Sequence, residues 1–324
     1  MENATIVIRD GVIRSVAPGG APPEGARVRD YTGLTVYAGF IEPYKEVEAP
    51  AVEAASPGAH WRTNVTPERS ALDGAGLDEN GREALRGLGF TAAAIAPDSG
   101  IFRGTGELIA LSEDATEISA GSARVIRGGV YQSVSPERGG WGGTPPTSLM
   151  GAIAVIRQAF LDAGWYAQTK AVEAARSEGI ERVDRSAALE ALGENNPDAT
   201  PILFDADTSL NALRMAKIAR EFDRTAILLG SGREYERIDA VAALGLGMIV
   251  PVNYPKKPDV STRALAESVS LKTLMAWEQA PTNLRRLDTA GATVALTTHR
   301  MKKTKSLNFC QNTCGQLSHK RSMM

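Results

Sequence analysis

The sequence predicts an α/β fold: a (β/α)8 barrel of the TIM type, incomplete at its C-terminal end. The second half carries the main signal, because short apolar runs alternate with amphipathic stretches of helical spacing. Continuous apolar strands between amphipathic helices are typical of a parallel sheet covered on both faces. Neither a Gly-x-Gly-x-x-Gly fingerprint nor a P-loop follows any of these strands, which argues against a nucleotide-binding fold and favours the barrel.

The strands and helices are expected in a regular order. Short strands with a turn at residues 10–11 occupy the first 36 residues. Barrel strands are predicted at residues 90–97, 201–206, 225–230, 247–252 and 292–298, and helices at residues 83–89, 145–177, 186–192, 210–222, 234–244 and 261–277. Alternating runs at residues 106–112 and 124–127 predict a β-rich insertion at about residues 100–130, after the second barrel strand. The glycines at 139–143 predict a flexible linker before the longest helix.

Three regions follow from this order. Residues 1–36 are predicted to form part of a β-sandwich, residues 37–300 the barrel, and residues 301–324 an aberrant or disordered basic tail. If residues 292–298 form the last strand, no helix follows to cover it, and the opening strands keep unpaired edges. We therefore expect a partner chain or a missing C-terminal segment to be needed for stability.

Composition narrows the classes of partner. The chain has 324 residues with 43% hydrophobic and 23% charged residues, which is typical of a soluble globular protein. A net charge of −2 argues against nucleic acid or an anionic membrane as partner. Met1, Glu2 and Asn3 lead directly into a strand without a signal sequence, so the chain as written is expected in the cytoplasm, or exported if its N-terminus is incomplete.

The last 24 residues differ from the rest, because they contain Lys and Arg but no Asp or Glu. Three interpretations are open: a reading-frame error near residue 304, a disordered terminus, or a basic interaction arm. Both cysteines of the chain, Cys310 and Cys314, lie here together with His319. Zinc would need a fourth ligand nearby, so no metal is expected in the tail.

Residues 35–46 read Thr-Val-Tyr-Ala-Gly-Phe-Ile-Glu-Pro-Tyr-Lys-Glu and follow an opening block that alternates like a strand. Together the two blocks resemble the start of the amidohydrolase superfamily, most closely its imidazolonepropionase-like branch. In that family the first barrel strand ends Pro-Gly-Phe-Ile-Asp-x-His-x-His, and the two histidines bind a divalent metal. Here Gly39, Phe40 and Ile41 keep the frame of the motif, while Tyr44 and Glu46 stand at the two histidine positions.

The resemblance extends over about residues 4–300. The later strands, like the first, lack the residues that bind the metal in the family. The segment ending at His299 resembles the final strand, where the family has an Asp that acts as ligand and base. Asp205 stands where a strand usually offers a histidine, and Ser231 follows the next such strand. The family implies a divalent metal such as zinc, but the chain has only three isolated histidines. We therefore expect no metal and no cofactor in this form.

In a barrel, the active site lies at the C-terminal ends of the strands. That rule selects the following candidates: Glu42, Tyr44, Asp98, Asp205, Asp207, Ser231, Asn253 and His299. Asp205 and His299 are the predicted catalytic pair, with Glu42, Tyr44, Glu46, Asp98, Ser231 and Asn253 at the pocket mouth. Weak binding of Mg²⁺ or Mn²⁺ by Glu42, Glu46, Asp205 and His299 is an alternative. Asp207 or Thr208 is expected instead to cap the helix that begins near Ser209.

Three functional hypotheses follow. The resemblance implies a hydrolase acting on non-peptide C–N bonds, of the cyclic amide class, with little or no activity because the metal ligands are missing. The alternative is a non-catalytic binding or scaffold module that holds a small-molecule ligand at the barrel mouth. A third is a metal-free hydrolase that uses Asp205 and His299. The substrate itself has no recognisable code in the sequence.

Overall fold

The computed structural model describes residues 1–10, 12–53, 56–112, 125–139, 145–176, 178–179, 181–193 and 200–301. The chain divides into two compact units, Met1–Ala38 and Gly39–Met324. Most of the predicted glycine linker, from residue 140 onward, and the basic tail with Cys310, Cys314 and His319 lie outside the described residues.

The first unit is a β-hairpin followed by irregular chain. Strands β1 (Ala4–Arg9) and β2 (Val12–Pro18) pair antiparallel. The pairing places four β-branched side chains on one face of the hairpin, all of them exposed: Ile6, Ile8, Ile13 and Val16. Within the described part of this unit no second sheet covers that face, so the unit shows a hairpin where the sequence predicts part of a sandwich.

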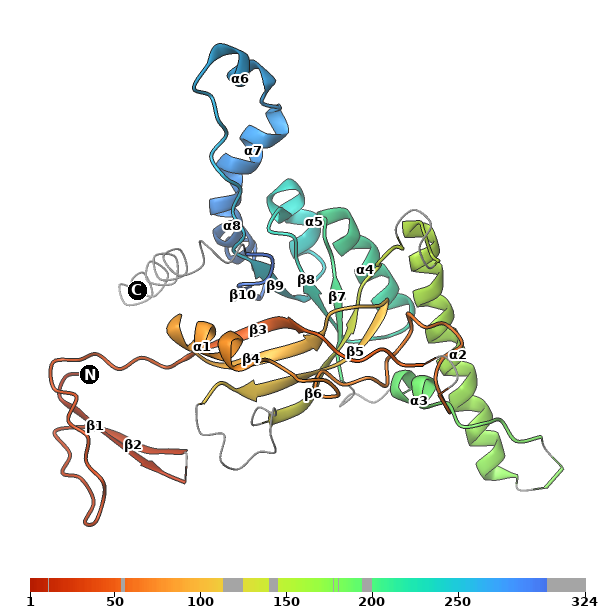
Figure 1. The fold of residues 1–324 in the computed structure, drawn as a ribbon, viewed down its shortest axis with the longest axis horizontal. Helices are drawn as coiled ribbons and strands as arrows, with labels where there is room; N and C mark the ends of the chain where they lie inside the picture. Colours follow the sequence, from red (N-terminus) through yellow and green to blue (C-terminus); the bar gives the residue numbers. More distant parts are fainter. Residues whose placement is uncertain are drawn as a thin grey trace. The chain divides into compact units, whose positions relative to one another are not determined.

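The second unit is built on one eight-stranded sheet that forms a nearly closed barrel (Figure 1). Its strands are β3 (Phe40–Val47), β4 (Phe90–Pro97), β5 (Phe102–Ala110), β6 (Val125–Val134), β7 (Ile202–Asp205), β8 (Ala226–Leu229), β9 (Gly247–Pro251) and β10 (Val294–Thr297). They are hydrogen-bonded in sequence order from β3 to β10. The strand predictions in the second half are therefore confirmed to within three residues at each end.

Strand β5 departs from the predicted (β/α)8 pattern. It runs antiparallel to both β4 and β6, whereas the other neighbouring pairs are parallel. The runs predicted as an insertion thus lie within the sheet itself. Because β5 is reversed, its first residues meet the C-terminal ends of the other strands at the same rim of the barrel.

Helices cover the outer face of the sheet, as α2 and α4 beside β6–β8 show in Figure 1. The described helices of this unit are α1 (Glu79–Gly87), α2 (Leu149–Ala175), α3 (Ala187–Gly193), α4 (Ser209–Glu221), α5 (Ile238–Ala242), α6 (Arg263–Ser268), α7 (Leu271–Gln279) and α8 (Asn283–Thr289), with 3-10 turns η2 (Glu234–Arg237) and η3 (Ala280–Thr282). The Thr208 hydroxyl accepts a bond from the Asn211 N–H at 3.1 Å, which confirms the predicted N-cap of α4.

Alternation along each strand divides the core into two layers. On β7, Ile202 and Phe204 pack outward against the helices, while Leu203 points inward. Two tyrosines, Tyr44 and Tyr131, lie in the inner layer with ring centroids 6.3 Å apart. The interior is therefore filled by side chains, as in other barrels of this size.

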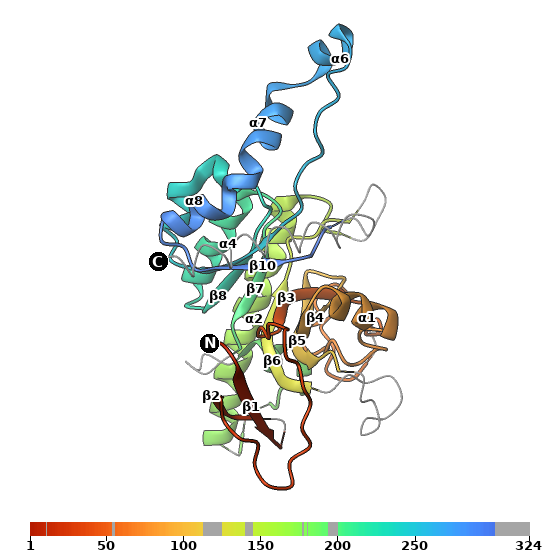
Figure 2. The ribbon, with the colours of Figure 1, turned by 90° about the vertical axis from the view of Figure 1, so that its left-hand side faces the viewer.

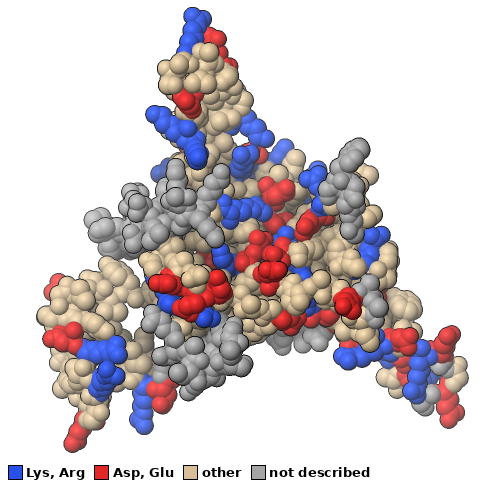
Figure 3. All heavy atoms as spheres, viewed as in Figure 1, with Lys and Arg blue, Asp and Glu red and all other residues tan. Residues whose placement is uncertain are grey.

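Helices α6 and α7 lie away from the strands in both views (Figures 1 and 2). Helix α6 buries no side chain, and α7 buries only Ala276. Among the described helices, none combines the length and apolarity needed to cross a membrane. Basic and acidic side chains are interspersed over the face seen in Figure 3, consistent with the small net charge of −2.

Candidate functional site

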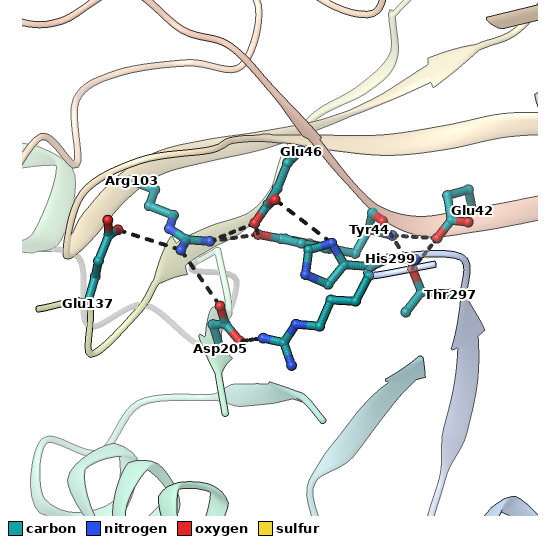
Figure 4. A network of polar contacts seen from close by, with 9 residues as sticks. Glu42, Tyr44, Glu46, Arg103, Glu137, Asp205, Thr297 and His299 are labelled. Carbon is teal, nitrogen blue, oxygen red and sulfur yellow. Dashed lines mark hydrogen bonds and ion pairs between the residues drawn. The ribbon is translucent and has the colours of Figure 1, made fainter. Parts of the chain in front are cut away.

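The rim of the barrel carries a connected group of polar side chains, shown in Figure 4. Strand β3 contributes three of them, because Glu42, Tyr44 and Glu46 alternate toward the interior. Asp205 ends β7, and His299 follows β10. The structure thus brings together the predicted catalytic residues Asp205 and His299 and two of the predicted mouth residues, Tyr44 and Glu46.

Arg103 lies at the centre of this group. It is the second residue of β5, and its side chain is buried to all but a few per cent. Its Nη1 donates to the Tyr44 hydroxyl at 3.0 Å and to Glu46 Oε1 at 3.1 Å. Its Nη2 lies 3.7 Å from both Glu137 Oε2 and Asp205 Oδ2. One guanidinium therefore faces three carboxylates drawn from three strands or strand ends (Figure 4).

These neighbours keep Arg103 charged. Burial by itself lowers the pKa of a guanidinium, but Tyr44, Asp205, Glu46 and Glu137 act in the opposite sense, and the pKa of Arg103 is raised above its usual value. The Arg103 Nε is buried and has no hydrogen-bond partner among the described residues.

Asp205 is held by a second guanidinium. Arg300 Nη2 donates to Asp205 Oδ1 at 2.6 Å, so each oxygen of this carboxylate faces a different arginine. Arg300 has a φ of +65°, a left-handed conformation that is rare for a residue with a side chain.

Tyr44 and His299 form the aromatic part of the rim. Their rings meet edge to face with centroids 4.9 Å apart. Tyr44 is fully buried and donates to Glu46 Oε1 at 3.1 Å, and burial raises the pKa of its phenol, so the hydroxyl keeps its proton. Burial also lowers the pKa of His299 to about 3, with Arg300, Arg103 and Lys45 adding to the effect. His299 Nδ1 lies 3.9 Å from Glu46 Oε2, but a neutral imidazole makes no ion pair there at pH 7.

The low pKa of His299 predicts a specific acid sensitivity. Unfolded, this histidine takes up a proton below about pH 6.5, while the folded protein resists protonation down to about pH 3. His299 should therefore remove up to about 1.4 kcal/mol of stability for each unit that the pH falls across this window. Urea unfolding of wild type and His299→Gln at several pH values would test this: the wild-type profile should fall more steeply below pH 6.5, and the two should run parallel above pH 7. Parallel profiles throughout would contradict the prediction.

Glu42 is fully buried inside the barrel rather than open to solvent at a pocket mouth. Its carboxylate accepts bonds from the hydroxyl of Thr297 at 2.5 Å, and from the backbone N–H and hydroxyl of Thr298 at 2.9 and 2.7 Å. Burial raises the pKa of Glu42, while these bonds and one from the Tyr44 N–H oppose the rise. Because β3 and β10 are the two ends of the sheet, Glu42 joins them by side-chain contacts where backbone pairing is missing.

The remaining predicted mouth residues lie elsewhere. Asp98 and Asn253 are exposed. Ser231 belongs to a local turn, in which its hydroxyl donates to Glu234 Oε1 at 3.0 Å and accepts from the Arg233 N–H at 3.1 Å.

Sequence reasoning missed two arginines and one glutamate at the rim. Arg103 begins a strand, so a rule that inspects only the C-terminal ends of parallel strands passes over it. Arg300 owes its position to a backbone conformation that no sequence motif signals. Glu137 does follow the end of β6, and it would have been selected if that strand had been assigned to the barrel.

A divalent metal, which the resemblance implies, does not fit these residues. Both oxygens of Asp205 face guanidinium groups, and Glu46 shares an oxygen with Arg103 and Tyr44. Across the described residues, no three His, Cys, Asp or Glu side chains are grouped so that they could hold a metal ion. The weak oxygen-rich site considered from the sequence, with Glu42, Glu46, Asp205 and His299, is therefore not formed.

Comparison with known proteins supports the fold. No family model matches the chain, and no curated protein sequence matches it. Among solved structures, the crystal structure of an amidohydrolase from Thermotoga maritima MSB8 matches with a TM-score of 0.66 and 18% identity, over 97% of this chain and 78% of that one. An uncharacterized protein matches with a TM-score of 0.49 and 14% identity, over 98% of this chain and 78% of that one. The first match shows that this chain has an amidohydrolase-like fold.

Proposed function

We propose that this chain is an amidohydrolase-fold protein in which metal-assisted hydrolysis of non-peptide C–N bonds, of the cyclic amide class, is lost or strongly impaired. The observation that carries the proposal is the buried Arg103 guanidinium between Glu46, Glu137 and Asp205. The name of the Thermotoga protein and the first-strand motif supply the reaction class. The charges at the rim supply the reason for impairment.

A catalytic metal contributes both charge and a bound water of lowered pKa. Arg103 provides positive charge at the rim and offsets part of the negative charge of the carboxylates there. It cannot lower the pKa of a water in the same way, because a guanidinium has N–H donors but no open coordination position. The rim therefore keeps a buried positive charge without a means of activating water.

The side chains left at the rim are poor substitutes for a metal-bound hydroxide. A general base works best when its pKa is near the operating pH, and the pKa of His299 is about 3. Both oxygens of Asp205 are already engaged, Oδ2 facing Arg103 at 3.7 Å and Oδ1 accepting from Arg300 at 2.6 Å. Neither group is therefore prepared to take a proton from water at neutral pH.

Metal content and turnover together test the proposal. The full-length protein would be expressed with zinc or manganese in the medium, its metal content measured by mass spectrometry, and its activity assayed on hydantoin, dihydrouracil and succinimide. We expect no stoichiometric metal and no hydrolysis above the uncatalysed rate. Bound metal with turnover that a chelator abolishes would contradict the proposal.

Metal-free turnover would also contradict it, and two variants identify the groups responsible. Loss of that activity in both Asp205→Asn and His299→Gln would establish a metal-free hydrolase at the rim. Activity that survives in both variants would place the chemistry elsewhere in the protein or in a contaminant.

A further inference from the structure

Helix α2 has two apolar faces. One face packs against the sheet and α3 and is fully buried; it carries Ala152, Val155, Ile156, Ala159, Phe160, Ala163 and Tyr166. The opposite face is exposed, yet it carries four large apolar side chains: Met150 (82% exposed), Leu161 (58%), Trp165 (56%) and Val172 (50%). A surface helix normally has one apolar stripe and a charged outer face. The apolar outer face of α2 therefore indicates a surface that binds a partner.

The four residues lie on one line along the helix. At ~100° per residue, Met150, Trp165 and Val172 all fall within about 40° of Leu161 around the helix axis. Ten residues of α2 lie within about 60° of Leu161, and Arg157 is the single charged residue among them. We call these four apolar side chains the α2 stripe. An outer face of this length with a single charge is unusual for a helix that stays in water.

We propose that the α2 stripe binds the α2 stripe of a second copy of this chain, with the two helices antiparallel about a two-fold axis at Leu161. The spacing of the stripe carries the proposal. Met150 and Val172 are each eleven residues from Leu161, which is about three helical turns. An antiparallel pair therefore sets Leu161 against itself and Met150 against the partner's Val172, as a self-complementary interface requires.

The one charge on this face fits the same arrangement. Arg157 and Trp165 are each four residues from Leu161, so Arg157 lies level with the partner's Trp165 along the helix axis. The Arg157 guanidinium is already oriented, because Nε and Nη2 bond the Glu221 carboxylate on α4 at 2.9–3.0 Å. A guanidinium over an indole is a favourable cation–π pair. The lone charge would thus stabilise the pair of helices.

The length of the stripe sets the expected strength. From Met150 to Val172 it is about 33 Å long, and a helix presents a face about 12 Å wide, which gives roughly 400 Å² on each protomer. Interfaces of this size lie at the weak end of specific association. The dimer should therefore form reversibly and depend on concentration.

A cysteine on the two-fold axis provides the test. Leu161→Cys, in a background of Cys310→Ser and Cys314→Ser, would place two thiols within disulfide distance across the interface. Ala174→Cys is the matched control, because Ala174 is equally on α2 and exposed but lies about 140° around the helix. Mild oxidation should convert Leu161→Cys to a covalent dimer on non-reducing gels and leave Ala174→Cys monomeric.

Sedimentation equilibrium measures the dimerisation directly, without a disulfide. Wild type should show concentration-dependent dimerisation that Leu161→Asp abolishes, with an unchanged circular dichroism spectrum because Leu161 is exposed. A wild type that stays monomeric at all concentrations, or equal cross-linking of the two cysteine variants, would overturn the proposal. In the first case the stripe would be covered by another part of the same chain or by a different protein.

Discussion

Replacing Arg103 by methionine is expected to lower the free energy of unfolding by about 3–5 kcal/mol, which is the usual cost of leaving a buried ion pair without one partner. The guanidinium compensates Glu46, Glu137 and Asp205 at once. Methionine fills a similar volume without charge, so the loss would report the electrostatic role of Arg103 rather than a cavity. Urea unfolding followed by circular dichroism measures it.

Arg263→Met is the matched control, because Arg263 also pairs with a glutamate, Glu267, but both side chains are exposed. An exposed pair contributes little, so this variant should unfold close to wild type. Equal losses in the two variants would show that Arg103 has no special electrostatic role at the rim.

Replacing Glu42 by alanine is expected to destabilise the barrel by about 3–5 kcal/mol. The change removes the acceptor for four donors, including the buried N–H of Tyr44 and the partly buried N–H of Thr298, and an unsatisfied buried donor costs about 1–3 kcal/mol. It also opens a cavity between β3 and β10. Urea unfolding again gives the measurement.

Two further variants separate these causes. Glu42→Gln keeps the volume and one acceptor but turns an amide N–H₂ toward donors, so its loss should be intermediate. Glu48→Ala lies six residues further along at an exposed position and should change little. A Glu42→Ala variant as stable as Glu48→Ala would show that the contacts of Glu42 do not hold the sheet together.

The sequence predicted the parallel part of the fold well, because its strands are buried on both faces and stand out as apolar runs between turn residues. The predicted strand at 90–97 coincides with β4, and the strands near 202, 226, 247 and 294 lie within the predicted ranges. The direction of β5 was not predictable in this way. The alternation of apolar and polar residues shows which side chains of a strand are buried. Parallel and antiparallel strands have the same alternation, so it does not indicate the direction of the strand.

The candidate site was predictable only in part, for a related reason. Glu42, Tyr44, Asp205 and His299 were selected because parallel strands end at one rim, and Glu46 because it stands at a histidine position of the first-strand motif. Arg103 reaches the same rim from the start of a reversed strand, and Arg300 reaches it through a left-handed backbone. The residues that define the charge balance of the site are thus those whose positions depend on tertiary structure rather than on local pattern.

The contacts of Glu42 also affect the order in which the barrel forms during protein synthesis. They join Glu42 to Thr297 and Thr298, 255 and 256 residues further along the chain. During synthesis from the N-terminus, β3 emerges early and has no partner on its outer edge until nearly the whole barrel has been translated. Contacts between such distant residues close large loops and form late. The nascent chain therefore carries an open sheet edge for most of its synthesis, the period in which a chaperone would have most to protect.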